Sequence, residues 1–367
     1  MNHKAVGIGL LVLLALMLGA PVMAQDAAEE PAALEPWVCP EGFVGQTLNV
    51  YNWSTYVAED TISNFEALCG ITVVYDTFES NESLLARLRQ GNPGYDIVVP
   101  TGHTVAQMVA EDLLMPLTAD NIPNLTNLSE ALADPVYDPG NAYSVPYQWG
   151  TTAVGYNTTK IDEITSWEQV FTYDGPVAWL DEPRMMMGVA LRLLGFDANS
   201  VNPDEIAAAR DFLIENGDNV VYIAADDGQE RLASGEVDIA VEYMGDIFQI
   251  GADCECEDFG FALPETAQVW VDNLAVPTGA QNPALAEVFI DYVLDPQVGA
   301  DIANYTAYAS PNQLAIDGGL IDPLYGESPV IYPDETTIER LFTVLTVPDA
   351  EQLYNDAWDE VKILIGG

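Results

Sequence analysis

The sequence predicts an α/β protein with two lobes, each a mostly parallel sheet flanked by helices. Short apolar or β-branched runs alternate with helical patterns along most of the chain, an order typical of parallel sheets covered on both faces. The 367 residues exceed what one hydrophobic core usually holds. Hydrophobic residues make up 49% of the chain, which is sufficient for two packed cores.

Residues 1–24 have the pattern of a secretory signal, with a basic start, an apolar stretch at 6–18 and a small-residue cleavage motif ending at Ala24. An uncleaved membrane anchor is the alternative, although the apolar stretch is short for a bilayer. Residues 25–45 are expected to form an acidic, flexible leader. We therefore predict a periplasmic or extracellular protein, tethered to the membrane if the signal is retained.

Three strands, each followed by a helix, are expected to begin the first lobe. The strands are predicted at 48–53, 71–75 and 95–100, and the helices at about 62–68, 84–88 and 105–113. Gly70 is expected to end the first helix, whose apolar face contains Ile62, Phe65 and Leu68. Ligands of such sheets bind at the carboxyl ends of the strands, so ligand contacts are expected at 52–56, 78–81 and 100–103.

An extended segment at 143–156 is expected to carry the chain into the second lobe. That lobe should contain strands at 177–180 and 237–242, with helices at 185–194 and after Asp204. A second extended run at 270–277 is expected to carry the chain back. The predicted lobes are 46–150 plus about 274–310, and 151–273 plus about 311–367, with a cleft between them that closes on a ligand.

The charge of the chain excludes nucleic acid as a partner. The formal net charge is −48, from 58 acidic residues against 10 Lys and Arg, and such a field repels phosphates. An acidic, solvated surface adapted to its surroundings explains most of this charge. The charge therefore favours cationic partners without locating a site.

Four cysteines in an exported chain favour disulfides. Cys39 and Cys69 are candidates for a bond that would pin the leader to the body of the protein. Cys254 and Cys256 could form a tight local bridge or remain thiols. No zinc-type spacing accompanies them, so no metal site is predicted.

Signatures of catalysis are missing from the sequence. The chain has no G-x-S-x-G, Walker A or H-E-x-x-H motif, and the mature part has no G-x-G-x-x-G. His103 is the only histidine after the signal, and no motif supports it as part of a triad. We therefore predict a binding protein without enzymatic activity and without a cofactor. A secreted hydrolase with an acidic pair remains the alternative from another class.

An aromatic and polar segment at 51–56, Tyr-Asn-Trp-Ser-Thr-Tyr, leaves the first predicted strand. With the segments 78–82, 95–100, 146–150 and 270–277 it makes the chain, from about residue 47 to 314, resemble the periplasmic spermidine/putrescine-binding proteins of ABC transporters. This resemblance implies the type II periplasmic-binding-protein fold, with a polyamine held between the lobes. It also implies a monomer that delivers its ligand to a membrane permease.

The resemblance further implies the ligand contacts of the first lobe. Trp53 and Tyr56 should flank the methylene chain, while Ser54 offers its hydroxyl to an ammonium. Thr101 stands where the family usually has a serine. His103 stands where spermidine binders have a tyrosine, and a histidine there could be a pH-sensitive contact because its reference pKa is near 6.5.

In the second lobe the resemblance implies acids and further aromatic walls. Glu182 fits an acidic position, but Met185 replaces an expected glutamate, so the distal ammonium is held differently or the ligand is shorter. Further contacts are implied at Tyr243, Asp246, Trp270, Asp272 and Tyr308, with Asp272 as the main amine-binding aspartate.

A polyamine joins ammonium groups by apolar methylenes, so its receptor needs separated carboxylates with aromatic walls between them. We therefore predict a receptor for spermidine or putrescine. The alternative within the binding class is a receptor of the same fold for another organic cation, suggested by Met185 and His103.

Overall fold

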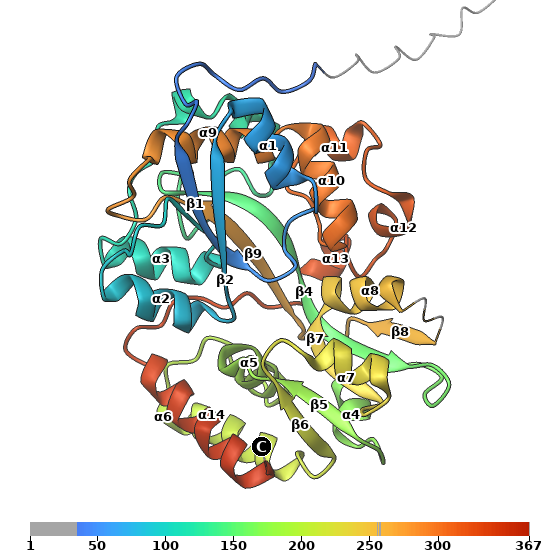
Figure 1. The fold of residues 1–367 in the computed structure, drawn as a ribbon. Coiled ribbons are helices and arrows are strands. Elements are labelled where there is room, and N and C mark those ends of the chain that lie inside the picture. Colours follow the sequence, from blue (N-terminus) through green and yellow to red (C-terminus); the bar gives the residue numbers. More distant parts are fainter. Residues whose placement is uncertain (1–34, 255, 257, 367) are drawn as a thin grey trace, which may run out of the picture. The chain divides into compact units, whose positions relative to one another are not determined.

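The computed structural model describes residues 35–254, 256 and 258–366 (Figure 1). The predicted signal at 1–24 and the start of the leader lie outside the described residues. Within the described part of the chain, no helix has the length and apolar character needed to cross a membrane.

The first half of the chain has the predicted order of strands and helices. It contains β1 (Thr47–Trp53), α1 (Thr61–Cys69), β2 (Thr72–Phe78), α2 (Asn81–Arg89), β3 (Ile97–Val98) and α3 (Gly102–Ala110). Strand β1 lies between β2 and β3 and is parallel to both. The third strand, predicted at 95–100, is only two residues long: Ile97 and Val98 pair with β1, and Val98 alone pairs with β9.

Helix α1 ends where the sequence predicted, but it buries a different face. Gly70 caps the helix with a φ of 65°, a left-handed conformation that glycine adopts without steric cost. Phe65 and Cys69 are buried, whereas Leu68, predicted to face the core, is 50% exposed. The buried side chains are spaced by four residues, which rotates the apolar stripe away from Leu68.

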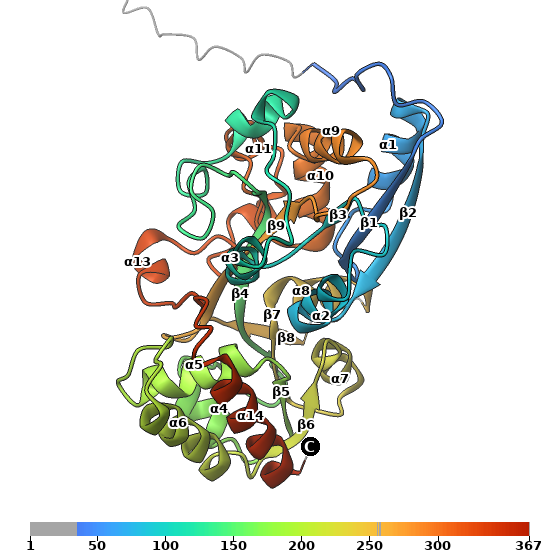
Figure 2. The same cartoon turned by 90° about the vertical axis from the view of Figure 1, so that its left-hand side faces the viewer.

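Two long strands connect the halves of the sheet. Strand β4 (Ser144–Asn157) pairs antiparallel with β9 (Gln268–Ala275), and also with β7 (Ile239–Tyr243) and β8 (Phe259–Ala262). The nine strands form one mixed sheet in the order β2-β1-β3-β9-β4-β7-β5-β6, with β8 added on β4 (Figure 2). The predicted crossings at 143–156 and 270–277 are therefore β4 and β9. Parallel pairing is confined to the outer strands of each half, so the sheet is less parallel than the sequence predicted.

The second half of the sheet adds β5 (Val177–Leu180) and β6 (Val220–Ala224), which are parallel to each other. Its helices are α4 (Trp167–Phe171), α5 (Pro183–Leu193), α6 (Pro203–Glu215), α7 (Gly228–Ser234) and α8 (Met244–Asp253). The C-terminal helix α14 (Glu351–Ile365) packs against α5 and α6. The end of the chain thus returns to the elements that follow β5.

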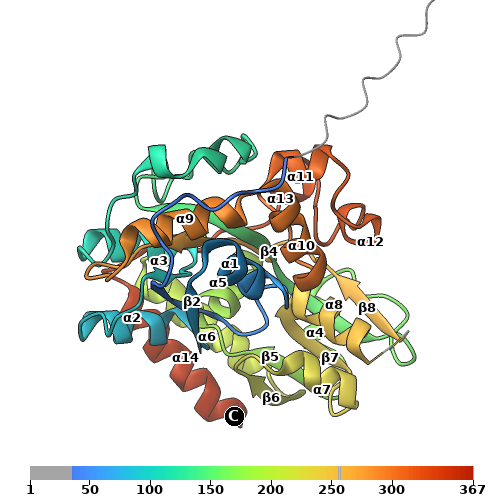
Figure 3. The same ribbon diagram turned by 45° about the horizontal axis from the view of Figure 1, so that its top comes forward.

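The remaining helices lie between α3 and β4 or in the segment that follows β9. They are η1 (Ala119–Asn121), η2 (Pro123–Asn127), α9 (Pro283–Val293), α10 (Pro296–Thr306), α11 (Gln313–Asp317), α12 (Pro323–Gly326) and α13 (Glu335–Ile338). Helices α9 and α1 lie side by side (Figure 3) and pack through Phe65 and Phe289, whose ring centroids are 5.0 Å apart.

Two large hydrophobic clusters form the core. One contains buried residues between positions 153 and 267 together with residues 341–361 of the C-terminal segment. The other contains buried residues between 48 and 147 and between 270 and 308. Residues 315–332 contribute to smaller clusters against α10 and the loop after it. The lobe boundaries given above stay a prediction.

The described part of the predicted leader is held against the body of the protein. A disulfide joins Cys39 to Cys69 at the end of α1. The Trp37 indole donates a hydrogen bond of 2.8 Å to Asp291. These two contacts attach residues 37 and 39 to the rest of the chain, as the predicted pairing of Cys39 with Cys69 implied, and the bounds of the leader at 25–45 stay a prediction. A second disulfide joins Cys254 to Cys256, so these residues are not thiols.

Candidate ligand-binding site

One pocket collects the side chains that the sequence singled out. It encloses about 560 Å³ of space not filled by protein atoms, part of it open to solvent. All eleven predicted ligand contacts line it: Trp53, Ser54, Tyr56, Thr101, His103, Glu182, Tyr243, Asp246, Trp270, Asp272 and Tyr308. Their role in binding stays a prediction, but the structure brings every one of them together.

The turn after β1 fixes the first group of pocket residues. The Asn52 side-chain oxygen accepts a hydrogen bond from the Trp53 amide, and the Trp53 indole donates to the Val99 carbonyl at 2.9 Å. Thr55 has a φ of 47°, a left-handed conformation that turns the chain sharply here. Trp53 and Tyr56 consequently both reach the pocket although they are three residues apart.

Asp272 is the most firmly held acid of the pocket. It is 5% exposed and accepts hydrogen bonds from the Tyr56 hydroxyl at 2.9 Å and the Thr101 hydroxyl at 2.6 Å. Asn81 donates to the Thr101 hydroxyl at 3.0 Å and thereby orients it toward Asp272. Burial raises the pKa of Asp272 to about 7, although both hydroxyls lower it.

Aromatic rings form the walls beside Asp272. The Tyr308 ring meets the rings of Tyr56 and Trp270 edge-on, each at a centroid distance of 5.3 Å. Tyr243 meets Trp270 edge-on at 6.0 Å. These faces and edges can enclose an apolar chain and attract a cation.

Two glycines make room for these rings. A Cβ at Gly150 would lie 2.8 Å from the Trp270 ring, and one at Gly245 would clash with the Tyr308 ring. This explains the glycine in both the 146–150 segment and the segment at 243–246, since any side chain there would displace a wall of the pocket.

Three carboxylates from the second half of the sheet gather at one side of the pocket. Asp226, Glu242 and Asp246 each offer an oxygen within 4.8 Å of the others. Both oxygens of Glu242 accept backbone N–H groups, from Gly228 at 3.2 Å and Tyr243 at 2.9 Å. Asp226 accepts the Ser54 hydroxyl at 3.0 Å, a contact between the ends of β1 and β6. Burial raises the pKa values of all three acids, and the charges of their neighbours raise them further.

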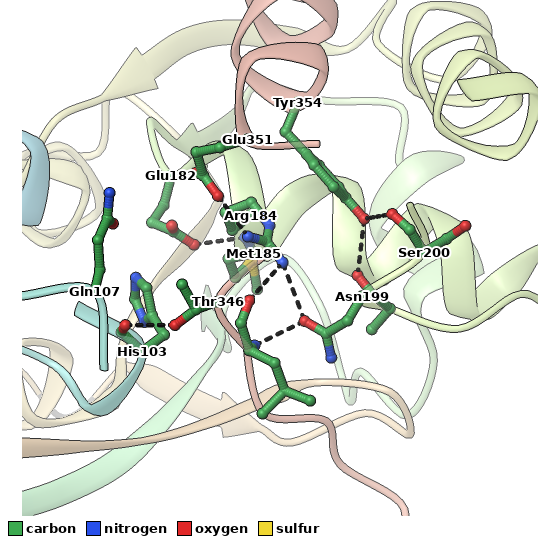
Figure 4. A network of polar contacts seen from close by, with 12 residues as sticks. His103, Gln107, Glu182, Arg184, Met185, Asn199, Ser200, Thr346, Glu351 and Tyr354 are labelled. Carbon is green, nitrogen blue, oxygen red and sulfur yellow. Dashed lines mark hydrogen bonds and ion pairs between the residues drawn. The ribbon is translucent and has the colours of Figure 1, made fainter. Parts of the chain in front are cut away.

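Glu182 provides a separate acid at the start of α5. It caps this helix by accepting a hydrogen bond from the Met185 amide (Figure 4). Burial raises the pKa of Glu182 to about 8. Met185 itself is fully buried in the hydrophobic core and does not line the pocket. The methionine that replaces the expected glutamate therefore leaves no gap in the pocket wall.

His103 lies in the pocket wall beside this helix, and its predicted pH sensitivity is wrong. Burial of the ring, together with the Arg184 charge, lowers its pKa to about 3. The ring is therefore neutral throughout the physiological pH range. The carbonyl of His103 accepts the Thr346 hydroxyl at 2.6 Å (Figure 4), which connects α3 to the segment before α14.

Sequence reasoning missed three further residues of the pocket wall: Asn81, Asp226 and Gln268. Asn81 lies in the strand-end segment 78–81 that was expected near the ligand. Asp226 follows β6, so a prediction of that strand would have placed it at the same edge of the sheet. Gln268 alternates with Trp270 and Asp272 along β9, a period-two pattern that indicates a shared face.

The chemistry of the pocket is that of a cation receptor. Among the residues that the structure describes, four carboxylates line it, those of Glu182, Asp226, Asp246 and Asp272, and the lining includes no lysine or arginine. Buried acids without a cationic partner are costly. A ligand with several separated ammonium groups supplies those partners, while its methylenes pack against the aromatic walls.

Comparison with known proteins agrees with this geometry. Residues 60–323 match the family described as bacterial extracellular solute-binding protein. The chain is 33% identical over 340 residues to the putrescine-binding periplasmic protein PotF of Escherichia coli, covering 86% of this chain and 91% of that protein. It is also 33% identical over 325 residues to a spermidine/putrescine-binding periplasmic protein of Salmonella typhimurium, with coverages of 86% and 91%.

A solved structure shows the same architecture. The spermidine/putrescine ABC transporter substrate-binding protein PotD of Streptococcus pneumoniae superposes with a TM-score of 0.76 at 29% identity. The match covers 88% of this chain and all of that one. The fold is thus the two-lobed type II fold of periplasmic binding proteins, and the chain belongs to the bacterial extracellular solute-binding protein family.

Proposed function

We propose that this protein captures a polyamine, spermidine or putrescine, in the pocket between β1, β9 and α5 and delivers it to the permease of an ABC transporter. The observation that carries the proposal is the combination of four lining carboxylates with the rings of Trp53, Tyr56, Tyr243, Trp270 and Tyr308. The names of the relatives, which are putrescine- or spermidine-binding periplasmic proteins, support the same ligand class. Export by the signal at 1–24 and a monomeric state are part of the proposal.

Isothermal titration calorimetry with putrescine and spermidine tests this function. We expect one polyamine per chain to bind with micromolar or better affinity, because each ammonium gains charge-assisted hydrogen bonds in a desolvated site. A neutral sugar and an acidic amino acid serve as controls and should give no binding heat. Absence of binding by both polyamines would contradict the proposal.

The raised pKa values predict that binding becomes stronger as the pH rises. In the folded protein the pKa values of Asp272 and Glu182 are about 7 and about 8, compared with about 4 for exposed carboxyls. The empty folded protein therefore binds more protons than the unfolded chain, so the stabilising contribution of these acids is present below about pH 4 and is lost as the pH rises toward 8. An ammonium ligand favours the ionised carboxylates and should release their protons.

We accordingly expect polyamine affinity to increase between pH 5.5 and pH 8, and the ligand to raise the melting temperature more at pH 8 than at pH 5.5. Calorimetry in buffers of different ionisation enthalpy measures the number of protons released. An affinity that does not change with pH, with no proton release, would show that these acids are already ionised in the empty protein.

A further inference from the structure

Gln268 at the start of β9 has a buried hydrogen-bond acceptor without a partner. Its side chain is 5% exposed and lines the pocket, and its Oε1 atom is bonded to no other group of the described residues. An unsatisfied buried carbonyl oxygen is uncommon in folded proteins and lowers their stability. The pocket therefore contains an acceptor that lacks an N–H donor.

Gln268 lies at the opposite end of a row of side chains from Asp272. Gln268, Trp270 and Asp272 alternate along β9 and all three line the pocket. A rise of about 3.3 Å per residue places the Cα atoms of Gln268 and Asp272 about 13 Å apart. The row thus presents an amide, an aromatic ring and a carboxylate in sequence.

The Gln268 end of this row is next to the helix that carries Glu182. Gln268 forms a β-bridge with Phe342, and the Phe342 ring lies against Gly188 of α5. Glu182 is the N-cap of the same helix. His103, whose ring is neutral, lines the same pocket.

Two other acids of the pocket, Asp272 and Asp246, lie near Tyr308. Its ring packs on Tyr56, which donates to Asp272, and it also abuts Gly245, the residue before Asp246. A short diamine with its two ammonium groups near Asp272 and Asp246 leaves Glu182 and Gln268 without a donor. A third amine, farther along the ligand, can supply that donor.

We propose that Gln268 is a ligand-binding residue whose Oε1 accepts a hydrogen bond from an ammonium also paired with Glu182, and that the pocket consequently prefers a linear triamine to a diamine. This inference rests on the proposed polyamine-binding function and names the ligand class of the same pocket. The amide contributes an acceptor without adding charge, so it improves geometry at an end where Glu182 already provides the negative charge.

The test compares spermidine with putrescine in titrations of the native chain and of Gln268→Met, which has a similar volume but lacks the acceptor oxygen. We expect the native chain to bind spermidine at least tenfold more tightly than putrescine. Gln268→Met should weaken spermidine binding about tenfold and change putrescine binding by less than twofold. The melting temperature of the empty variant should be equal to or above that of the native chain, because an unsatisfied acceptor is removed.

Gln169→Met is the matched control. The Gln169 side-chain oxygen accepts hydrogen bonds from the Thr165 amide at 2.7 Å and the Ser166 amide at 3.1 Å, and this residue does not line the pocket. That variant should melt at a lower temperature and bind both polyamines normally.

The outcomes separate the inference from the function on which it rests. A native chain that binds neither polyamine overturns both. A native chain that binds both polyamines, together with a Gln268→Met variant that is unaltered or equally weakened for the two, overturns the role of Gln268 alone. A large fall in the melting temperature of the empty variant would show that Gln268 is structural.

Discussion

Replacing Asp272 by asparagine is expected to weaken polyamine binding at least 100-fold. Removing one partner of a buried charged pair typically costs about 2–5 kcal/mol, and each 1.4 kcal/mol is a tenfold change in affinity. Asp272 is buried, and hydroxyls from Tyr56 and Thr101 fix its orientation. Asparagine keeps this shape but carries no charge, so the variant isolates the electrostatic contribution. Calorimetry with spermidine measures the loss.

The stability of the empty variant distinguishes a binding role from a structural one. Burial raises the pKa of Asp272 to about 7, so its ionised form destabilises the empty protein at pH 8. Asp272→Asn should therefore unfold at the same or a higher temperature at that pH. Asp238→Asn is the control, because Asp238 is equally buried but bonds Lys160 and Tyr173 outside the pocket. Unchanged affinity in Asp272→Asn would contradict the site assignment.

Replacing Glu351 by methionine is expected to lower the free energy of unfolding by about 3 kcal/mol, because it leaves a buried cation without its counter-charge. Arg184 is 1% exposed, and its guanidinium bonds Glu351 at 2.9 Å. It also donates to the Asn199 side chain at 3.0 Å and lies over the Tyr354 ring at 4.3 Å (Figure 4). Equilibrium unfolding in urea measures the change.

The double variant Arg184→Met/Glu351→Met should be more stable than Glu351→Met alone, because no uncompensated charge remains. The exposed pair of Arg210 and Glu360 provides the control, and Glu360→Met should cost less than about 1 kcal/mol. If the loss of unfolding free energy in the double variant equals the sum of the losses in Glu351→Met and in Arg184→Met, packing rather than charge governs the stability of this site. A weaker polyamine affinity should accompany Glu351→Met, since the segment 343–346 connects this network to His103.

The sequence placed the segments 52–56, 78–81 and 100–103 at the pocket because they follow strand ends. The carboxyl ends of parallel strands meet at one edge of a sheet, so a correct prediction of the strands before Trp53 and Thr101 also placed these residues together. In β9, the resemblance implied Trp270 and Asp272, and their alternation along the strand is the reason that both line the pocket. Where no strand was predicted, as at β6, the following residue Asp226 was missed.

The resemblance to a family gave the positions of the site but not their surroundings. It indicated that Met185 replaces an acid, whereas the structure buries Met185 in the core beside a pocket wall without a gap. It suggested a pH-sensitive His103, whereas burial keeps this ring neutral. Burial of a side chain depends on residues distant in the chain, so local sequence does not reveal it.

By itself the sequence determined the α/β class, most of the strands and helices and the cationic preference, because these follow from local periodicity and composition, whereas the eleven lining residues were implied by the resemblance to a family. Tertiary structure alone decided that β4 and β9 join the strands into one sheet. It also decided which carboxylates are buried away from water, and that the Oε1 atom of Gln268, a pocket residue, has no hydrogen-bond partner among the described residues. The reason is that desolvation and hydrogen bonding at a given residue are set by neighbours from several remote segments, which only the folded chain brings into contact.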